Sequence, residues 1–398
     1  MWTTVWFLIG GAALAEPAAD PVAWSVHAEH IRQMGQDRPL ERRSYPRPSA
    51  PPPSPDVTVY GYHPYWGPDP TTLDFARLTH LAIFNVDLNS DGTLSDTHRW
   101  TDVAGDVVPL AHAEGVSVQL CVTSFEDDVM ASALSDPSKR ATTIAELVEL
   151  VDAYGADGVN VDFEGLDYEL KDDFTAFIEE LYPLVAELTI AMPAIDWTGA
   201  YDFDRLAMSS DGLFIMGYGY HWTGGNPGPV APLFGGDPWS DYSLEWTVDD
   251  YLTWGATQDK LILGLPLYGH EWPTASDAVP GTATGTGWSV VMSSADTIAD
   301  SEGSQWDETS LTPYVLRSNS QLWYDNTESI QARIQWAVDQ ELQGIGFWAL
   351  GYETESSGFW EMVTEETSWT GDDPDDPDDP DDPDDPDDPD DPDDPDDP

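Results

Sequence analysis

Three carboxylates fall within one short apolar stretch, DGVNVDFEG at residues 157–165. Asp157, Asp162 and Glu164 stand there among valines, glycines and a phenylalanine, and burying ionised carboxylates in such surroundings is costly unless each has a partner or a function. Side chains alternate along a strand, so Asn160, Asp162 and Glu164 would share one face and the apolar residues the other. The stretch therefore indicates a strand that presents acids on one face.

Two neighbouring carboxylates repel each other's charge, so one of them should keep its proton to a higher pH and be available as an acid. Glycoside hydrolysis needs such a group to protonate the leaving oxygen. The alternative is an inward polar layer satisfied by hydrogen bonds. That alternative accounts for Asn160 and Asp157, but poorly for two acids at the end of the strand.

Eight β-rich runs alternate with helical patterns and would position these residues. The runs are 57–62, 78–86, 116–125, 158–164, 188–194, 212–218, 260–269 and 343–350. This alternation predicts an α/β fold, a (β/α)8 TIM barrel over residues 57–371, with a small inserted subdomain at about 273–325 between strands seven and eight. An open doubly wound sheet is less favoured because no Gly-rich phosphate loop is found. Glu164 would lie at the mouth of the barrel, where such enzymes place their chemistry.

Several segments resemble the motifs of glycoside hydrolase family 18, the chitinase-like family. DGVNVDFE resembles its D-G-x-D-x-D-x-E strand, in the Asn-containing form of a bacterial branch with spore-cortex and peptidoglycan-associated members. The other similar segments are VYGYHPYW, IMGYGYHW, LILGLPLYGHEW and GIGFWALGYE, in the family's order along residues 57–365.

The resemblance implies substrate-assisted retaining hydrolysis, in which the substrate's own 2-acetamido oxygen attacks the anomeric carbon. Glu164 would be the general acid and then the base. Asp162 would orient the acetamido N–H, Tyr218 would hydrogen-bond the acetamido oxygen, and Trp348 would form the floor under the distorted sugar. We expect no cofactor and no metal.

Further substrate contacts are expected from Asp157 and Asn160 on the acidic strand and from aromatic residues along the cleft. The aromatic candidates are Tyr62, Trp66, Trp197, Trp222 and Trp272, although any one of 18 tryptophans has packing as its commoner role. Two positions depart from the family pattern. Asn160 replaces an Asp, and Gly219 replaces the Asp of M-x-Y-D, which removes an expected partner of the acetamido group.

Both ends of the chain differ in composition from the barrel. Residues 1–15 end in a small-x-small pattern and are expected to be a secretory signal peptide. Residues 16–56 are expected to be a Pro/Arg-rich linker, so that the folded unit begins near Val57. Residues 372–398 are nine Asp-Asp-Pro repeats, which predict a disordered acidic tail. We therefore expect a secreted protein, extracellular or at the cell surface.

The formal net charge is −61, with 75 acidic against 14 basic residues. Such a chain should repel nucleic acid and anionic membranes, and no membrane span is expected. The acidity fits either a well-solvated surface or adaptation to high salt. Cys121 is the only cysteine, so an intramolecular disulfide is excluded, and a buried inert thiol is expected. A monomer is expected.

The leading hypothesis is a hydrolase of β-linked N-acetylglucosamine polymers, such as chitin or peptidoglycan. The alternative is a non-catalytic, lectin-like barrel that binds chitin or a related glycan, which the loss of Asp at Gly219 favours. A weaker alternative is a surface-display or matrix protein in which the Asp-Asp-Pro tail is the functional part.

Overall fold

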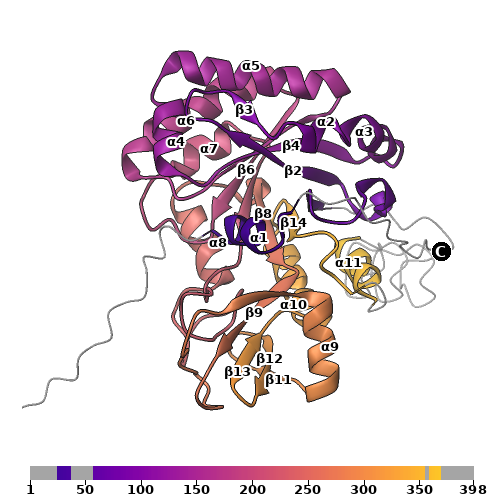
Figure 1. Ribbon diagram of the computed structural model, residues 1–398, viewed down its shortest axis with the longest axis vertical. Coiled ribbons are helices and arrows are strands. Elements are labelled where there is room, and N and C mark those ends of the chain that lie inside the picture. Colours follow the sequence, from indigo (N-terminus) through magenta and orange to yellow (C-terminus); the bar gives the residue numbers. More distant parts are fainter. Residues whose placement is uncertain (1–24, 37–56, 355–357, 369–398) are drawn as a thin grey trace, which may run out of the picture.

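The computed structural model describes residues 25–36, 57–354 and 358–368. The expected signal peptide at 1–15 and the tail at 372–398 lie outside these ranges. Within them, the largest element is a closed barrel of parallel strands with helices around it (Figure 1), as the sequence predicted.

The barrel strands follow the eight β-rich runs of the sequence. They are β1 (Thr58–Pro64), β2 (His80–Leu88), β4 (Ser117–Ser124), β5 (Gly158–Phe163), β6 (Glu187–Pro193), β7 (Gly212–Met216), β8 (Leu261–Pro266) and β14 (Gly344–Trp348). Neighbouring strands pair in parallel, and the pairing of β1 with both β14 and β2 closes the barrel. A short antiparallel strand, β3 (Leu94–Ser95), extends β2. Closure brings the carboxyl ends of all eight strands to one mouth.

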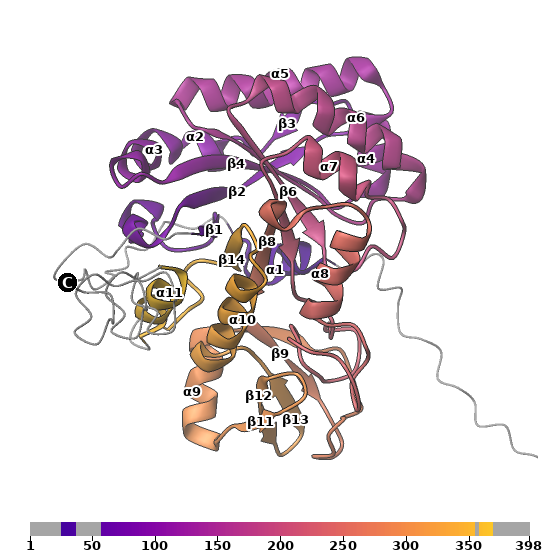
Figure 2. The same ribbon diagram turned by 180° about the vertical axis from the view of Figure 1, so that it is seen from behind.

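Helices pack around the barrel and connect its strands (Figure 2). They are α2 (His98–Thr101), α3 (Ala104–Ala113), α4 (Asp127–Leu134), α5 (Pro137–Tyr154), α6 (Lys171–Leu181), α7 (Phe203–Met208), α8 (Leu244–Thr253), α10 (Thr327–Asp339) and α11 (Phe359–Thr367). Short 3-10 turns lie at Pro70–Thr72, Phe75–Arg77, Tyr168–Leu170, Tyr182–Leu184 and Gln258–Lys260. No helix of the described ranges is both long and apolar enough to span a membrane.

The two ends of helix α5 show how the sequence determines where a helix begins and ends. The side chain of Asp136 accepts a hydrogen bond from the Ser138 N–H and caps the first turn, with Pro137 in the first helical position. Gly155 ends the helix with φ at 64°, a left-handed conformation that glycine adopts without steric cost. The chain then enters β5 directly, which fixes where the acidic strand begins.

A second sheet is inserted between β8 and α10, at the lower end of the molecule in Figure 1. Its strands are β9 (Tyr268–Pro273), β10 (Trp288–Val291), β11 (Gln305–Asp307), β12 (Thr312–Arg317) and β13 (Ser320–Trp323), all antiparallel, with α9 (Met292–Glu302) against them. The insertion therefore begins at Tyr268, earlier than the residue 273 expected. The sequence analysis had joined the first two residues of β9 to β8, because residues 260–269 form one largely apolar run.

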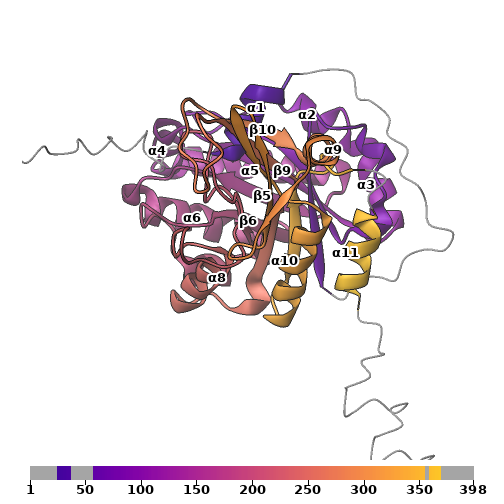
Figure 3. The ribbon, with the colours of Figure 1, turned by 90° about the horizontal axis from the view of Figure 1, so that it is seen from below.

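One helix lies within the segment that we expected to be linker. Residues Val26–Met34 form α1, with Ser25 as its N-cap. The helix lies beside the labels of β8 and β14 at the centre of Figure 1 and at the upper margin of the molecule in Figure 3. The expectation that ordered structure begins near Val57 is thus wrong for this segment. Apart from Val26, the side chains that the helix buries are polar, namely His27, Glu29 and His30.

A buried ion pair joins α10 to the short connection that leads into it from β13. Arg333 and Asp325 are both fully buried, with 3.2 Å between Nη2 and Oδ1, and Arg333 also donates to the carbonyl oxygens of Ala231 and Leu311. Removing one partner of such a pair leaves an uncompensated buried charge. The pair therefore matters for stability more than any surface pair of this acidic chain.

We predict that Arg333→Ala lowers the free energy of unfolding by about 3–5 kcal/mol. Arg205→Ala is the matched control, because Arg205 pairs with Glu179 at the surface, where ion pairs contribute little. Urea unfolding of both variants measures the difference. Equal losses in the two variants would contradict the buried-pair account.

Candidate active site

The acidic strand β5 presents its polar residues to the inside of the barrel, as its alternation predicted. Asn160 is buried and donates to Thr189 Oγ1 at 2.9 Å, while Tyr62 on β1 donates its hydroxyl to Asn160 Oδ1 at 2.9 Å. Asp162 is fully buried, and Glu164 follows immediately after β5 at the mouth. Asn160 and Tyr62 thus support the strand from below the two acids.

Tyr218 and Trp348 reach the same place from other strands. Tyr218 follows β7 and Trp348 ends β14, and both side chains are buried. The Trp348 ring contacts Tyr62 and Phe84 in edge-to-face arrangements, with centroids 5.7 and 4.8 Å apart. Its orientation is therefore set by the rings beneath it.

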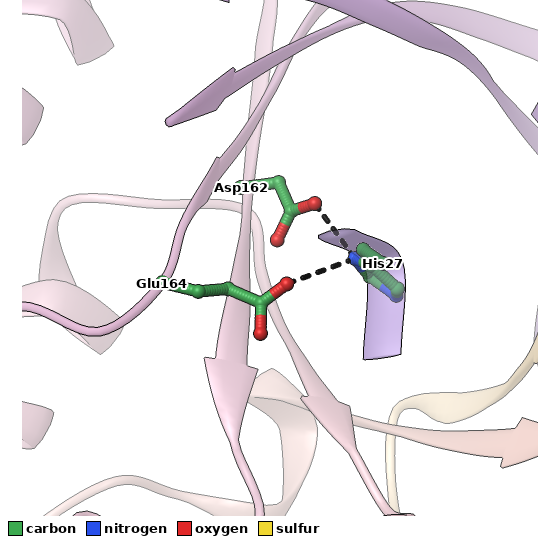
Figure 4. A group of neighbouring side chains, drawn as sticks. All are labelled: His27, Asp162 and Glu164. Atoms are coloured by element: carbon green, nitrogen blue, oxygen red, sulfur yellow. Dashed lines mark hydrogen bonds and ion pairs between the residues drawn. The ribbon is translucent and has the colours of Figure 1, made fainter. Parts of the chain in front are cut away.

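The side chain of His27 on α1 lies among these groups. Its Nδ1 is 2.7 Å from Asp162 Oδ2 and 3.3 Å from Glu164 Oε1, as Figure 4 shows, and its Nε2 is 2.9 Å from the Tyr218 hydroxyl. The imidazole also lies over the Trp348 ring, with centroids 3.7 Å apart and planes 30° apart. One ring therefore contacts all four residues assigned to the reacting sugar.

Neighbouring residues of α1 fix the helix in this position. The Ser25 hydroxyl donates to Glu164 Oε1 at 2.7 Å, and Trp348 Nε1 donates to His30 Nδ1 at 2.9 Å. Glu29 Oε2 accepts from the Thr223 hydroxyl at 2.8 Å. The sequence analysis did not assign these residues to the site. The sequence signal for them was a serine that could cap a helix, followed by two histidines three residues apart. This pattern does not reveal which residues the histidines contact in the folded protein.

Burial and charge determine the protonation of the acidic pair and its partner. Burial, followed by repulsion from Asp162, raises the pKa of Glu164 to about 8, although His27 and the Ser25 hydroxyl act in the opposite direction. Burial disfavours the charge on His27, but attraction to Asp162 and Glu164 outweighs it, so the pKa of His27 is raised. The result is a protonated acid at Glu164 near neutral pH, as a general acid requires.

His27, Asp162 and Glu164 are also the one group of potential metal ligands among the described residues, with ligand atoms within 4.8 Å of one another. Zinc ligands lie at about 2.0–2.2 Å from the metal in a tetrahedral arrangement, so two donors stand more than about 3 Å apart. The 2.7 Å between His27 and Asp162 is a hydrogen-bond distance. The arrangement therefore fits a shared proton better than a metal ion.

A cleft open to solvent continues from Glu164 past Val26, the first residue of α1. Trp197, Trp222 and Tyr218 line it together with Val26 of the helix, and Trp197 is half exposed. Trp66 and Trp272 do not line it; both are buried, and their indole N–H groups donate to Tyr352 and to the Trp222 carbonyl. Of the aromatic candidates, Trp197 and Trp222 are thus placed to contact a ligand directly.

Asp157 is not in the site, which corrects the sequence interpretation. Its carboxylate accepts from the Val118 N–H at 2.7 Å and lies 2.8 Å from His112 Nε2, at the opposite end of β5 from Glu164. The reason is strand parity, because Asp157 shares its face with the apolar residues. Gly219 does line the cleft, and its φ of 84° is one that side-chain-bearing residues rarely adopt, so the glycine fits this backbone.

The sequence profile of glycosyl hydrolases family 18 matches residues 58–353, most of the chain. The chain belongs to this family. In this barrel the ends of β5, β7 and β14 meet at one mouth, which brings the acidic strand, Tyr218 and Trp348 together. Membership of the family supports the function of a glycoside hydrolase.

Relatives in family 18 are distant in sequence. The chain is 24% identical over 294 residues to the cortical fragment-lytic enzyme of Bacillus subtilis, covering 68% of this chain and 64% of that protein. It is 25% identical over 273 residues to the di-N-acetylchitobiase of Mus musculus, covering 59% and 70%. The chain spans less than two thirds of the length of three Bacillus subtilis relatives.

Solved family 18 structures share the fold. A chitinase from Cycas revoluta in complex with (GlcNAc)3 superimposes with a TM-score of 0.71 at 20% identity, covering 78% of this chain and 100% of that one. At this identity the likeness establishes the barrel, and the details of the site rest on the residues described above.

The raised pKa of Glu164 gives a direct test of its environment. Because the pKa in the folded chain lies above the usual value, the carboxyl should stay protonated at neutral pH and ionise as the pH rises through about 8. We expect a ¹³C-glutamate NMR titration of the intact chain to show a step there that is missing in Glu164→Gln. A Glu164 step near pH 4–5, the ordinary range, would contradict the buried-acid description.

Proposed function

We propose that this chain is a secreted retaining glycoside hydrolase that cleaves β-linked N-acetylglucosamine polymers by substrate-assisted catalysis. The observation that carries the proposal is the convergence of Asp162, Glu164 and Tyr218 over the Trp348 ring, where all three polar groups already hold one planar nitrogen-containing ring. An acetamido group is also planar, with a donor on one side and an acceptor on the other.

In this mechanism the carbonyl oxygen of the 2-acetamido group attacks the anomeric carbon while Glu164 gives its proton to the departing glycosidic oxygen. Asp162 accepts a hydrogen bond from the acetamido N–H, which stabilises the positive charge that develops on the ring intermediate. The Tyr218 hydroxyl donates to the acetamido oxygen and aligns it. Glu164, now ionised, then takes a proton from the water that opens the intermediate, and the anomeric configuration is retained.

The names of the relatives support this substrate class. One is a cortical fragment-lytic enzyme and another a di-N-acetylchitobiase, and the Cycas revoluta chitinase binds (GlcNAc)3. Peptidoglycan fragments and chitin share β-linked N-acetylglucosamine units, so one site can serve either polymer. Products of hydrolysis on chitin oligomers and on cell-wall sacculi, identified by mass, distinguish the two.

A lectin-like barrel is the second candidate, and Gly219 is the observation that favours it. The glycine lacks the carboxylate that the family pattern places beside Tyr218. Against it stands the raised pKa of Glu164, because a protein that only binds glycans has no need of a proton donor. Binding without turnover by the wild-type chain would favour the lectin.

We predict that Glu164→Gln lowers turnover of chitin oligomers about 10²–10⁴-fold and leaves oligomer binding nearly intact, since the amide is similar in size but delivers no proton. Glu149→Gln, an exposed change on α5, is the control and should keep full activity. Kinetics and calorimetry on the same preparations separate turnover from binding. Wild-type turnover by Glu164→Gln would rule out this acid.

We also predict that the first products carry the β anomeric configuration and that a thiazoline analogue of the ring intermediate competes with substrate. Both follow from attack by the acetamido oxygen with retention. ¹H NMR of the reaction in its first minutes reads the configuration before mutarotation. Inverted products would show that water attacks directly and would refute the substrate-assisted mechanism.

A further inference from the structure

The N-terminal helix occupies the position that the proposed mechanism reserves for the reacting sugar. His27 lies between Asp162 and Tyr218 and over Trp348, and Ser25 donates to Glu164. No function proposed so far requires a helix of the chain itself in this place. The contacts are made by side chains of α1 and of its N-cap Ser25, all of which lie within the described residues 25–36.

The chemistry of these contacts imitates a substrate. Imidazole is planar, as an acetamido group is, and its Nδ1–H faces the Asp162 carboxylate as the acetamido N–H would. Asp162 faces Nδ1 and the Tyr218 hydroxyl faces Nε2, so the two ring nitrogens occupy the places that the proposed mechanism gives to the acetamido N–H and oxygen. The Ser25 hydroxyl donates to Glu164, as the attacking water would. Sugar and helix therefore cannot occupy the site together.

We propose that residues 25–34 are an internal inhibitor: a Ser-x-His peptide that fills the sugar site and must leave before a glycan can be cleaved. This inference rests on the proposed function, because it uses the same four residues as the sugar site. It adds a second ligand for that site, a peptide carrying serine and histidine, and a means of holding the enzyme inactive.

Contacts beyond the sugar site hold the helix in place. Glu29 bonds Thr223, His30 accepts from Trp348, and the Gly35 carbonyl accepts from the Tyr65 hydroxyl at 2.9 Å. Gln33 Oε1 accepts from the Ser289 N–H of the inserted sheet at 3.3 Å. The helix thus bridges the barrel mouth and the insertion, and each of these contacts is lost when it leaves.

The short length of α1 keeps the free-energy cost of its release low. A helix of nine residues is marginal on its own in water, so its order depends on docking. The barrel does not need the helix for closure, since its eight strands pair without it. Release therefore exposes a preformed site and unfolds only a short segment.

The expected consequence is quantitative. A glycan binds only the fraction of molecules whose site is free, so its apparent affinity is reduced by that fraction. His27→Ala removes the ring stacked on Trp348 and its bonds to Asp162 and Tyr218. We expect it to raise kcat/KM for a chitin tetramer at least tenfold and to tighten binding of a thiazoline inhibitor by a similar factor.

The test uses the full chain as wild type, His27→Ala, Ser25→Ala and Arg32→Ala. Arg32 is exposed on the same helix, so Arg32→Ala changes α1 without touching the site and should behave as wild type. Ser25→Ala should give a smaller gain, because it removes the bond to Glu164 and the helix cap. Thermal melts check that the barrel is intact in each. Amide exchange of residues 26–34 is measured in parallel and should be slow in wild type and Arg32→Ala but fast in His27→Ala.

The outcomes separate this inference from the proposed function. Equal hydrolysis by wild type and His27→Ala, or fast exchange of the helix in wild type, would overturn the inhibitor while leaving the hydrolase in place. Slow exchange in wild type that His27→Ala abolishes, without cleavage or binding of the tetramer by any variant, would uphold the docked peptide and refute this substrate. A gain confined to the two site-facing variants, at least tenfold in His27→Ala and smaller in Ser25→Ala, supports both.

Discussion

The cost of burying Asp162 and Glu164 side by side governs this structure. Two carboxylates with almost no exposed surface at the end of β5 cannot both be ionised without a partner, so one keeps its proton and the other needs a cation or donors. The barrel supplies Tyr62 and Asn160 beneath them, and within the described ranges the ion pairs of the two acids are those with His27. In the resting chain the partner is His27, from outside the barrel. In the proposed reaction it is the acetamido N–H and then the positive ring intermediate.

This constraint relates the two proposals to each other. A site built to stabilise positive charge next to Asp162 also attracts an imidazole, and an aromatic floor that receives a sugar also receives a flat ring. The features that suit the site for catalysis thus also suit it for inhibition by a histidine. The acidity of the chain strengthens this attraction, since His27, whose pKa is raised, faces a strongly negative protein.

Much of the barrel could be predicted from sequence because its signals are local. Short β-rich runs located all eight strands. Period-two alternation placed Asn160, Asp162 and Glu164 on the inner face, and the order along the strand placed Glu164 at the mouth. The same alternation argued against Asp157, whose parity puts it with the apolar residues, and including it in the site was wrong. Tyr218 and Trp348 could be named only through family resemblance, because no local pattern joins the ends of β7 and β14 to β5. Helix α1 was missed because its stability comes from polar contacts with residues more than a hundred positions away, and its Pro-rich flank is typical of linkers.

The central claim is that His27 and the sugar compete for the same groups. NMR of the full chain labelled with ¹⁵N-histidine tests this most directly, with the His27 signals assigned by comparison with His27→Ala. On saturation with the thiazoline inhibitor, the account predicts that the His27 ring signals move from their buried values to those of an imidazole in water. Unchanged His27 signals in the saturated complex would mean that the ring and the ligand occupy different places, and they would contradict the account.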